Sequence, residues 1–374
     1  MENITSTQQN IPNYEKLIKS YELSASHEEK FESKHWKERN EIKRAKFFNL
    51  LNENLKTLEE FRKDKFLSKG LDDAVDTHNI PSAFFKLAEK HGAERCLKFF
   101  QEKNVGKSDK CIYLFKKFID YHEIFLVDYV IQLEEYFFKE KEKQKPIICE
   151  IGGGYGALAR MIISNQNCKY ILIDLPETNI LSSYYLEEHF KDTDKKILHF
   201  CDLDKVSLSP EDIKGFDIII IPPNIEFEKN LRIDLFINTR SFMEMKLSTV
   251  EKYFNLIQSN IKSDGFFLNI NRYHKSTSNE KNMIAYYPYD LNWKIILSEK
   301  AFMQDWIHLL LTKRANLVNQ DFHDELENLK EYSKKHITSL SKRLLFNILS
   351  LISRIIPSYV KQLIKRLITT QIPE

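Results

Sequence analysis

A cluster of glycines in a glycine-poor chain most strongly constrains how this protein can fold. Only nine of the 374 residues are glycine, and four of these are Gly152, Gly153, Gly154 and Gly156. They follow the short apolar run IICEI and precede ALARMIIS, which has helical spacing. Glycine permits a tight turn and a close approach of the backbone to a ligand. The segment therefore predicts a strand, a ligand-binding turn and a helix, the arrangement found at the carboxyl edge of an open α/β sheet.

The rest of the central region alternates between strand and helix patterns. Short apolar runs rich in β-branched residues, typical of strands buried on both faces, recur at 147–151, 170–175, 216–221, 233–238 and 265–270. Helical patterns lie between them, at 157–164, 178–190 and 248–261. Ser248 with Glu251 fits a capping box at the start of the last helix. The alternation predicts an α/β, Rossmann-like sheet. Two runs at 293–303 and 306–314 predict an antiparallel hairpin at its edge.

We expect three parts along the chain. Residues 1–143 are predicted to form a helical N-terminal domain that serves as a cap, an acceptor contact or an oligomer contact. Residues 144–316 are predicted to form the sheet domain, and residues 317–374 a basic helical tail. The charged run KEKEKQK before Pro146 predicts a hinge between the first two parts.

Charge and cysteine content narrow the class of protein. The net charge of +2 argues against a nucleic-acid-binding protein. Five scattered cysteines without a CxxC pair, and an N-terminus without an apolar segment, predict a cytoplasmic protein with reduced thiols. The acidic segment with Asp72, Asp73, Asp76 and His78 is interpreted as a solvated loop, so no metal site is predicted.

The C-terminal tail is distinct from the body. Residues 334–374 hold eight Lys or Arg and one acidic residue, a charge of +7 that leaves −5 for the remainder. Apolar residues at helical spacing within 336–368 predict a basic amphipathic helix. Such a helix suits the anionic inner face of a membrane, or it packs on its own domain or on a second copy in an oligomer. Both interpretations stay open.

The glycine cluster fits two ligand-binding patterns. Gly152, Gly154 and Ala157 match G-x-G-x-x-A, the dinucleotide fingerprint, whereas Glu150 and the glycines match E-x-G-x-G-x-G, the first motif of class I methyltransferases, which bind S-adenosylmethionine. Asp174, which ends the second strand, suits ribose hydroxyls in either case. Glu150 favours the methyltransferase, because a carboxylate attracts the methionyl ammonium and repels a pyrophosphate. The predicted edge hairpin also favours it, and an NAD(P)-dependent oxidoreductase is the alternative.

Four segments strengthen this interpretation: IGGGYGALAR, YILIDLPETNILSSYYL, IDLFINTRSFMEM and NINRYHK. Together they resemble a bacterial family of sugar O-methyltransferases, over about residues 146–314. The resemblance implies a class I fold and methyl transfer from S-adenosylmethionine to a sugar hydroxyl. The sugar would belong to a surface glycan (capsule, O-antigen or lipooligosaccharide) or to its nucleotide-linked precursor. A catalytically silent methyltransferase-like scaffold in glycan assembly is a further alternative.

The candidate site residues lie at the predicted strand ends. Two segments compete for the third strand, 197–204 with Asp202 and 216–224, and we favour the second. The predicted donor-binding residues are Glu150, Gly152, Gly154, Tyr155, Gly156, Asp174, Leu175, Pro222, Asn224 and Asn238. The candidate general bases are Glu244 and His274. The predicted acceptor-binding residues, whose cations suit a nucleotide- or phosphate-linked sugar, are Arg240, Ser241, Arg272, Tyr273 and Tyr289.

Overall fold

A computed structural model describes most of the chain between the N-terminal and C-terminal segments. The described residues are 14–25, 56–64, 67, 77–141, 144–203, 207–277 and 280–334. Three predicted features lie wholly or partly outside them: residues 1–13 and 26–55 of the predicted helical N-terminal domain, the acidic residues Asp72, Asp73 and Asp76, and the basic tail from 335. Among the described residues, no helix has both the length and the apolar character needed to cross a membrane.

The centre of the molecule is an eight-stranded sheet in the order β13-β14-β10-β9-β3-β4-β7-β5. Its strands are β3 (Ile147–Ile151), β4 (Lys169–Ile173), β5 (Ile197–His199), β7 (Ile218–Ile221), β9 (Ile233–Thr239), β10 (Ile261–Arg272), β13 (Trp293–Ala301) and β14 (Gln304–Arg314). The neighbouring pairs from β10 to β5 are parallel, and β14 is antiparallel to both of its neighbours. The predicted edge hairpin is confirmed, since β13 and β14 are joined through Phe302 and Met303 alone.

The two segments considered for the third strand are both strands. β7 pairs directly with β4, so the favoured segment occupies the predicted place, and β5 lies outside it at the edge. Asp202 follows β5 in the short helix η6 (Phe200–Asp202), accepts a hydrogen bond from the His199 amide at 3.0 Å and forms an ion pair with Lys16. Asp202 therefore stabilises the edge of the sheet.

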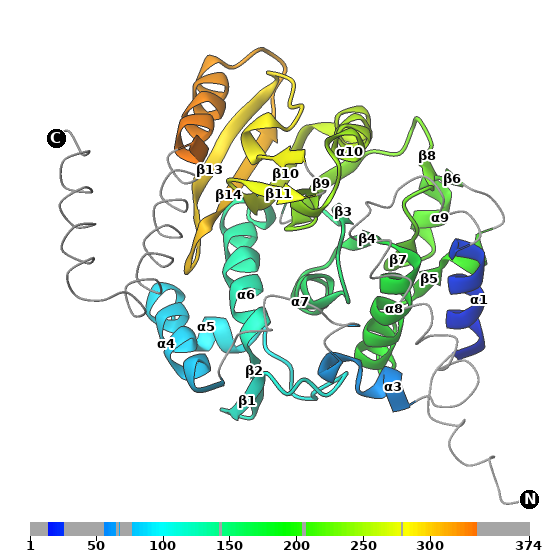
Figure 1. Cartoon of the computed structure of the whole chain (residues 1–374). Coiled ribbons are helices and arrows are strands. Elements are labelled where there is room, and N and C mark those ends of the chain that lie inside the picture. Colours follow the sequence, from blue (N-terminus) through cyan, green and yellow to red (C-terminus); the bar gives the residue numbers. More distant parts are fainter. Residues whose placement is uncertain are drawn as a thin grey trace, which may run out of the picture.

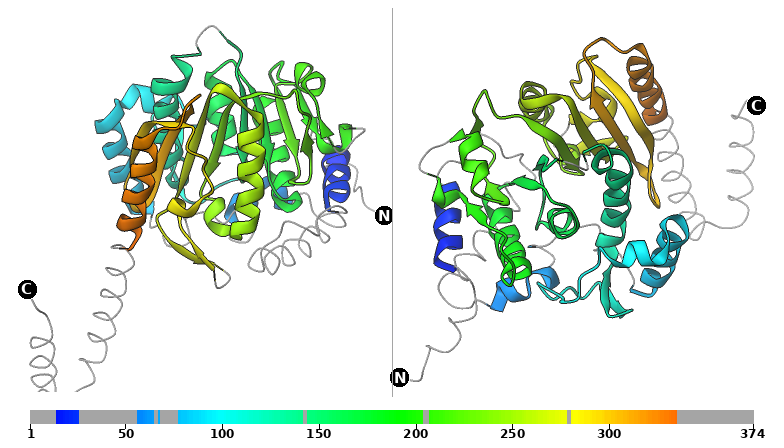
Figure 2. Two further views of the ribbon diagram at one scale, coloured as in Figure 1. Left: turned by 90° about the horizontal axis from the view of Figure 1, so that it is seen from above. Right: turned by 180° about the vertical axis from the view of Figure 1, so that it is seen from behind.

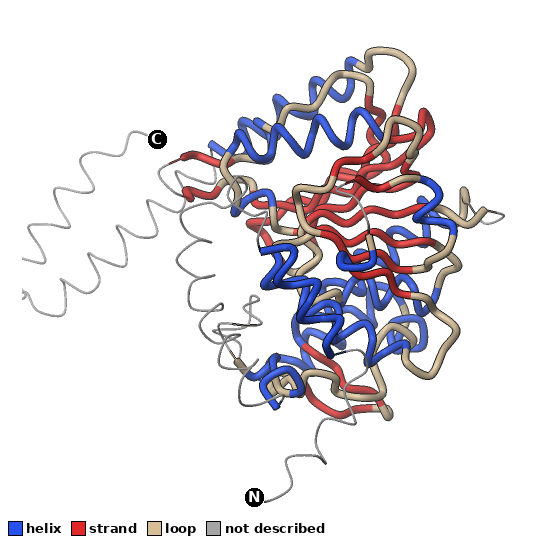
Figure 3. The backbone as a smooth tube through the Cα atoms, turned by 90° about the vertical axis from the view of Figure 1, so that its right-hand side faces the viewer, coloured by secondary structure: helices blue, strands red, loops and turns tan. Residues whose placement is uncertain are grey.

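Helices cover both faces of the sheet, as Figures 2 and 3 show. Because side chains alternate along a strand, one face of the sheet packs against α6 (Tyr121–Leu133), α7 (Ala157–Asn165) and α8 (Pro176–Phe190). The other face packs against α9 (Pro210–Lys214), α10 (Leu247–Asn260) and the helical segment 320–334. The five-residue π-turn η5 (Glu134–Phe138) extends α6.

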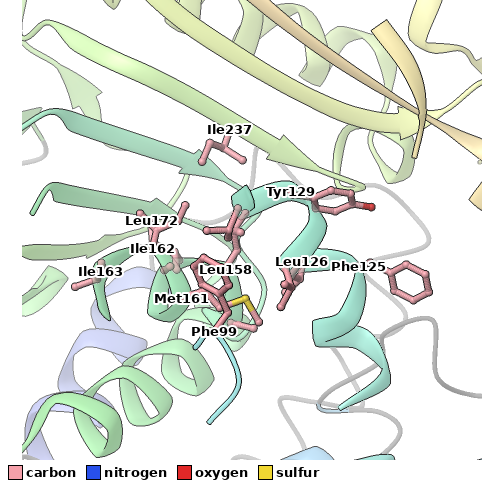
Figure 4. Packing of buried hydrophobic residues seen from close by; sticks show 14 of the residues in the cluster. Phe99, Phe125, Leu126, Tyr129, Leu158, Met161, Ile162, Ile163, Leu172 and Ile237 are labelled. Carbon is pink, nitrogen blue, oxygen red and sulfur yellow. The ribbon is translucent and has the colours of Figure 1, made fainter. Parts of the chain in front are cut away.

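The N-terminal region packs onto the first of these faces (Figure 1). It contains α1 (Tyr14–Ala25), α3 (Lys56–Glu59), α4 (Ile80–His91), α5 (Ala93–Leu97) and the hairpin β1 (Cys111–Leu114) with β2 (Lys117–Asp120). Its apolar side chains share one hydrophobic cluster with α6, α7 and the sheet. Figure 4 shows part of that cluster, in which Leu126 of α6 lies beside Leu158 and Met161 of α7.

The remaining helices and strands are short. They are η2 (Phe61–Lys63), η4 (Thr77–Asn79), β6 (Ser207–Leu208), β8 (Glu226–Phe227), η7 (Phe242–Glu244), β11 (Lys275–Thr277), β12 (Glu280–Asn282) and η8 (Ile284–Tyr286). The capping box predicted at Ser248 is wrong. α10 begins one residue earlier, its N-cap is Lys246, and no side chain caps it. β10 begins directly after α10, at Ile261, because a bulge before Phe266 keeps the strand paired with β9.

Candidate functional site

The glycine turn links β3 to α7 through three left-handed residues. The φ angles of Gly152, Gly154 and Gly156 are 75°, 59° and 90°, values that L-residues with a Cβ rarely adopt. The Gly152 amide donates to the Ile173 carbonyl at 2.7 Å, which fixes the turn beside the end of β4. Gly156 is the N-cap of α7. The predicted strand, turn and helix are confirmed.

Close packing beneath the turn explains two of the glycines. A Cβ on Gly152 would overlap the Ser241 hydroxyl, and a Cβ on Gly153 would lie 2.9 Å from Glu150 Oε2. Gly154 differs, because a Cβ there would meet no atom within 4 Å. The turn is therefore packed against the protein on one side and open at Gly154, which fits a ligand that approaches the backbone from that side.

Asp174 connects the turn to the second strand. Its Oδ2 accepts from the Gly154 amide at 2.8 Å and its Oδ1 from the Leu175 amide at 2.7 Å. The Asn179 side chain donates to the Asp174 and Ile221 carbonyls, which joins the ends of β4 and β7. A carboxylate at the end of the second strand is the kind of group that accepts hydrogen bonds from ribose hydroxyls. Half-buried Asn224 and buried Pro222 follow β7, next along this edge.

Glu150 lies under the turn and is 1% exposed. Its Oε2 accepts from the Tyr170 hydroxyl at 2.7 Å. Burial raises the pKa of Glu150 to about 7; the Tyr170 hydrogen bond opposes this and the Asp174 charge adds to it. The carboxyl group thus titrates near neutral pH, where a nearby cation would favour its ionised form.

Asparagine side chains form a buried network at the ends of β9 and β10. Asn238 donates to the Ile151 carbonyl at 2.8 Å and to the Ser241 hydroxyl at 2.6 Å, and its Oδ1 accepts from Asn271 and from the Phe242 amide. The side chain of Asn238 is thereby fully engaged within the protein. Asn238 and Ser241 fix the loop after β9 against the glycine turn.

The predicted bases and cations gather after β9 and β10. Glu244 contacts Lys275 through Oε1, while its buried Oε2 has no hydrogen-bond partner among the described residues. Arg240 follows β9, and Arg272 ends β10. Burial lowers the pKa of Arg272, an effect that Glu244 opposes and Arg240 increases, which indicates that the three charges lie near one another. His274 is half-buried and directly precedes Lys275, the first residue of β11.

The predicted aromatic residues lie mainly in the core. Tyr273 is buried, with its hydroxyl 3.0 Å from His308 Nδ1 and its ring against Tyr332. The Tyr289 hydroxyl accepts from Asn269 at 2.8 Å, and its ring packs edge-on against Phe254 and Trp293. Their contacts are those of packing residues, and their acceptor-binding role stays a prediction.

The structure adds residues from α6 that the sequence interpretation missed. The first half of α6 lies at the carboxyl edge of the sheet, because Phe125 packs against Arg240, which follows β9, and His122 lies beside Tyr155 of the glycine turn. Asp120 caps the helix by accepting from the His122 amide at 2.9 Å. The buried Nδ1 of His122 and the Tyr155 hydroxyl have no hydrogen-bond partner among the described residues, and the two rings lie 6.1 Å apart. Burial, aided by Arg240, lowers the pKa of His122 to about 4, so its imidazole is neutral at pH 7. The capping pattern around Asp120 was the available sequence signal.

The polar groups at this edge of the sheet can also be considered as metal ligands. Within the ranges that the structure describes, no three His, Cys, Asp or Glu side chains are grouped to hold a metal ion. The arrangement instead offers a backbone turn, an acid at the second strand end and unpartnered polar groups at the ends of β9 and α6. It suits an organic ligand that lies along the carboxyl edge of the sheet.

Comparison with known proteins gives a likeness to solved structures only. No family model and no curated protein matches the chain. A methyltransferase from Pyrococcus furiosus is 12% identical, over 51% of this chain and 83% of that chain, with a TM-score of 0.31. An O-methyltransferase family protein from Burkholderia thailandensis is 11% identical, over 52% and 58%, with a TM-score of 0.34. An RNA methyltransferase from Salinibacter ruber, in complex with S-adenosyl-L-homocysteine, is 6% identical, over 50% and 94%, with a TM-score of 0.30. The fold assignment rests on the strand order: this is an α/β, Rossmann-like sheet of the class I methyltransferase type.

Proposed function

We propose that this protein is an S-adenosylmethionine-dependent O-methyltransferase whose acceptor is a sugar hydroxyl of a bacterial surface glycan or of its nucleotide-linked precursor. One observation carries the proposal. The glycine turn is hydrogen-bonded through Gly154 to Asp174, in a sheet whose antiparallel strand β14 lies between β10 and β13. A dinucleotide-binding sheet accounts for the turn and the acid but not for that strand. The sugar acceptor is supported by the sequence resemblance alone.

The residues present fit the proposed donor. When bound, S-adenosylmethionine supplies a methyl group on a sulfonium, which a hydroxyl oxygen takes up as the carbon–sulfur bond breaks and the hydroxyl proton leaves. The open backbone at Gly154 and the carboxylate of Asp174 suit the nucleoside, and ionised Glu150 suits the ammonium of the methionyl group. The main contribution of the chain is to position the two reactants and exclude water.

The proton of the hydroxyl needs an acceptor. Glu244 and His274 remain the candidate bases, and the structure adds His122, because its buried Nδ1 is unpartnered among the described residues. Glu244 is already in contact with Lys275 through Oε1. We therefore add His122 to Glu244 and His274 as a third candidate base.

The proposal is tested by calorimetric titration with S-adenosylmethionine, S-adenosylhomocysteine and NAD. We expect micromolar binding of the first two and none of NAD. An Asp174→Asn variant should weaken donor binding at least ten-fold, because a neutral amide accepts more weakly from ribose hydroxyls than a carboxylate does. Asp202→Asn, at the edge strand, is the matched control and should bind normally. Binding of NAD without S-adenosylmethionine would establish the oxidoreductase instead.

A further inference from the structure

Arg240 is half-buried and differs from the buried arginines Arg62 and Arg160. Arg62 Nη2 lies 2.7 Å from Asp120 Oδ2, and Arg160 Nη2 lies 3.0 Å from Glu123 Oε2. Arg240 has no carboxylate at ion-pair distance among the described residues; its Nη2 donates to neutral oxygens of Tyr129 at 3.2 Å and Gln304 at 2.7 Å. A guanidinium that is partly shielded from water and lacks a counter-charge is costly, so this arrangement requires an explanation.

The unused donors of Arg240 are also buried. Its Nε and Nη1 are shielded from solvent and have no hydrogen-bond partner in the part of the chain that the structure describes. Leaving buried donors unpaired typically costs free energy of folding. Two nitrogens of one cation that both lack partners point to a group that completes them when it binds.

The guanidinium is fixed in place before any ligand arrives. The Arg240 backbone is left-handed, with φ of 60°, and its amide donates to the Ile270 carbonyl at 2.7 Å. The guanidinium carbon lies 5.3 Å from the centre of the Phe125 ring. Figure 4 shows Phe125 and Tyr129 on the side of α6 that faces away from Leu158 and Met161. Ring and hydroxyl together orient the cation along α6.

Two more polar groups surround the same place. The Nε of Arg272, at the end of the neighbouring strand, is buried and unpartnered among the described residues, as is Nδ1 of His122. Arg240 immediately precedes Ser241, which packs against Gly152 in the glycine turn. The unpaired cations therefore lie where the proposed function places the reacting groups.

We propose that Arg240, with Arg272 beside it, binds a phosphate or carboxylate group of a bound reactant. This inference rests on the proposed function and narrows it. An anionic group of the sugar acceptor, such as the phosphate of a nucleotide-linked sugar, is one source of this chemistry. The methionyl carboxylate of the donor is the other. Either would pair with Arg240 and satisfy donors that have no partner among the described residues.

The test is a calorimetric titration of inorganic phosphate into the wild type, Arg240→Gln and Arg232→Gln. Arg232 is a matched control, because it lies at the opposite end of β9, is exposed and donates to the Lys229, Leu231 and Ser259 carbonyls. We expect Arg240→Gln to weaken phosphate binding at least ten-fold and Arg232→Gln to leave it unchanged. Equal phosphate affinity in all three proteins, with unchanged binding of S-adenosylhomocysteine, would overturn the inference.

Saturating S-adenosylhomocysteine separates the two sources. If phosphate still binds to the loaded protein through Arg240, the anionic group belongs to the acceptor. If S-adenosylhomocysteine displaces phosphate, and Arg240→Gln weakens S-adenosylhomocysteine but not methylthioadenosine, which lacks the carboxylate, the group belongs to the donor. Phosphate binding that depends on Arg240, in a protein that binds no S-adenosylhomocysteine, would refute the proposed function and leave the anion site intact.

Thermal unfolding distinguishes a binding role from a structural one. In phosphate-free buffer, Arg240→Gln should unfold at the same temperature as the wild type or above it, because the variant no longer holds a half-buried charge without a counter-charge. A clear decrease, with unchanged anion binding, would assign Arg240 to structural support. Arg240→Lys is the second variant if the first does not fold; it keeps the charge and should retain part of the phosphate affinity.

Discussion

Glu150 shows how one buried carboxyl group can respond to a ligand. Its pKa is raised to about 7, chiefly by burial, so the folded protein holds a proton that the unfolded chain releases near pH 4.5. Its contribution to stability is therefore fully present below about pH 4.5 and is lost as the pH rises through about 7. A cation bound nearby would reverse part of this loss, because it favours the ionised form.

We predict that donor binding near pH 7 releases protons from Glu150. The ammonium of S-adenosylmethionine should lower the pKa of the carboxyl group, so the apparent binding enthalpy should differ between two buffers with different ionisation enthalpies. Glu150→Gln keeps an acceptor for the Tyr170 hydroxyl and should abolish the difference. The variant should also flatten the decrease in stability between pH 4.5 and 7. Identical enthalpies in both buffers for the wild type would show that Glu150 lies outside the reach of the ligand.

The sequence allowed some of these residues to be placed in the fold, but not others. Glu150 and Asp174 could be placed because a glycine motif and a strand end fix where they lie. Tyr273 and Tyr289 could not, because an aromatic residue has the same sequence signature whether it faces a ligand or packs in a core. His122 escaped notice because its role depends on the meeting of α6 with the loop after β9, which no local pattern encodes.

Within the glycine turn, Gly154 is the position at which an added Cβ would have open space around it. Gly152 and Gly153 are packed against Ser241 and Glu150, so packing within the protein explains why these two positions are glycine. Gly154 is left-handed with open space beyond it, so its need for glycine comes from the backbone angle and from whatever approaches it. This distinction allows ligand contact to be separated from folding.

We predict that Gly154→Ala lowers the free energy of unfolding by about 1 kcal/mol, the usual cost of a left-handed alanine, and weakens donor binding at least ten-fold. Gly92→Ala is the control. Gly92 also has a positive φ and open space around its Cβ, but it lies between α4 and α5. It should lose stability without losing affinity. Denaturant unfolding and calorimetry measure the two quantities; normal donor affinity in Gly154→Ala would exclude contact at the turn.

The helices and strands were predicted more accurately than the residues at which they begin and end. Apolar runs identified β3, β4, β7, β9 and β10, because burial on both faces removes polar residues from a strand. The start of β10 was missed because Lys262, Ser263 and Asp264 are polar and partly exposed where the bulge lifts the strand from the core.

On the scale of the whole molecule, the sequence predicts a hinge at 139–145, but two described lysines of this segment form ion pairs with the sheet region. Lys141 is 4% exposed and pairs with Asp264, and Lys145 lies 2.9 Å from Asp217. Composition predicted a linker because charged runs are usually solvated, whereas these lysines reach strand-end carboxylates. The N-terminal helices and the sheet also share one hydrophobic cluster. We therefore expect the described helical region and the sheet to unfold together.

A buried ion-pair network offers a test of this coupling. Glu123 of α6 lies 3.0 Å from Arg160 of α7 and 3.7 Å from Arg62, and Arg160 Nη1 donates to the Phe99 carbonyl. Removing one member of a buried pair typically costs about 3–5 kcal/mol, because the partner charge stays buried. Arg160→Met should therefore lower the free energy of unfolding by about that amount.

The variant should still unfold in one transition, since the packing that joins the helices to the sheet is continuous. Arg95→Met is the matched control: its pairs with Glu134 and Glu135 are partly solvated, so its loss should cost less than about 1 kcal/mol. Far-ultraviolet circular dichroism and tryptophan fluorescence report on the two regions differently, because fully buried Trp293 lies in the sheet. Coincident curves in wild type and variant would establish one cooperative unit, whereas an earlier loss of helical signal would mean that α4 to α6 form a separately folding domain.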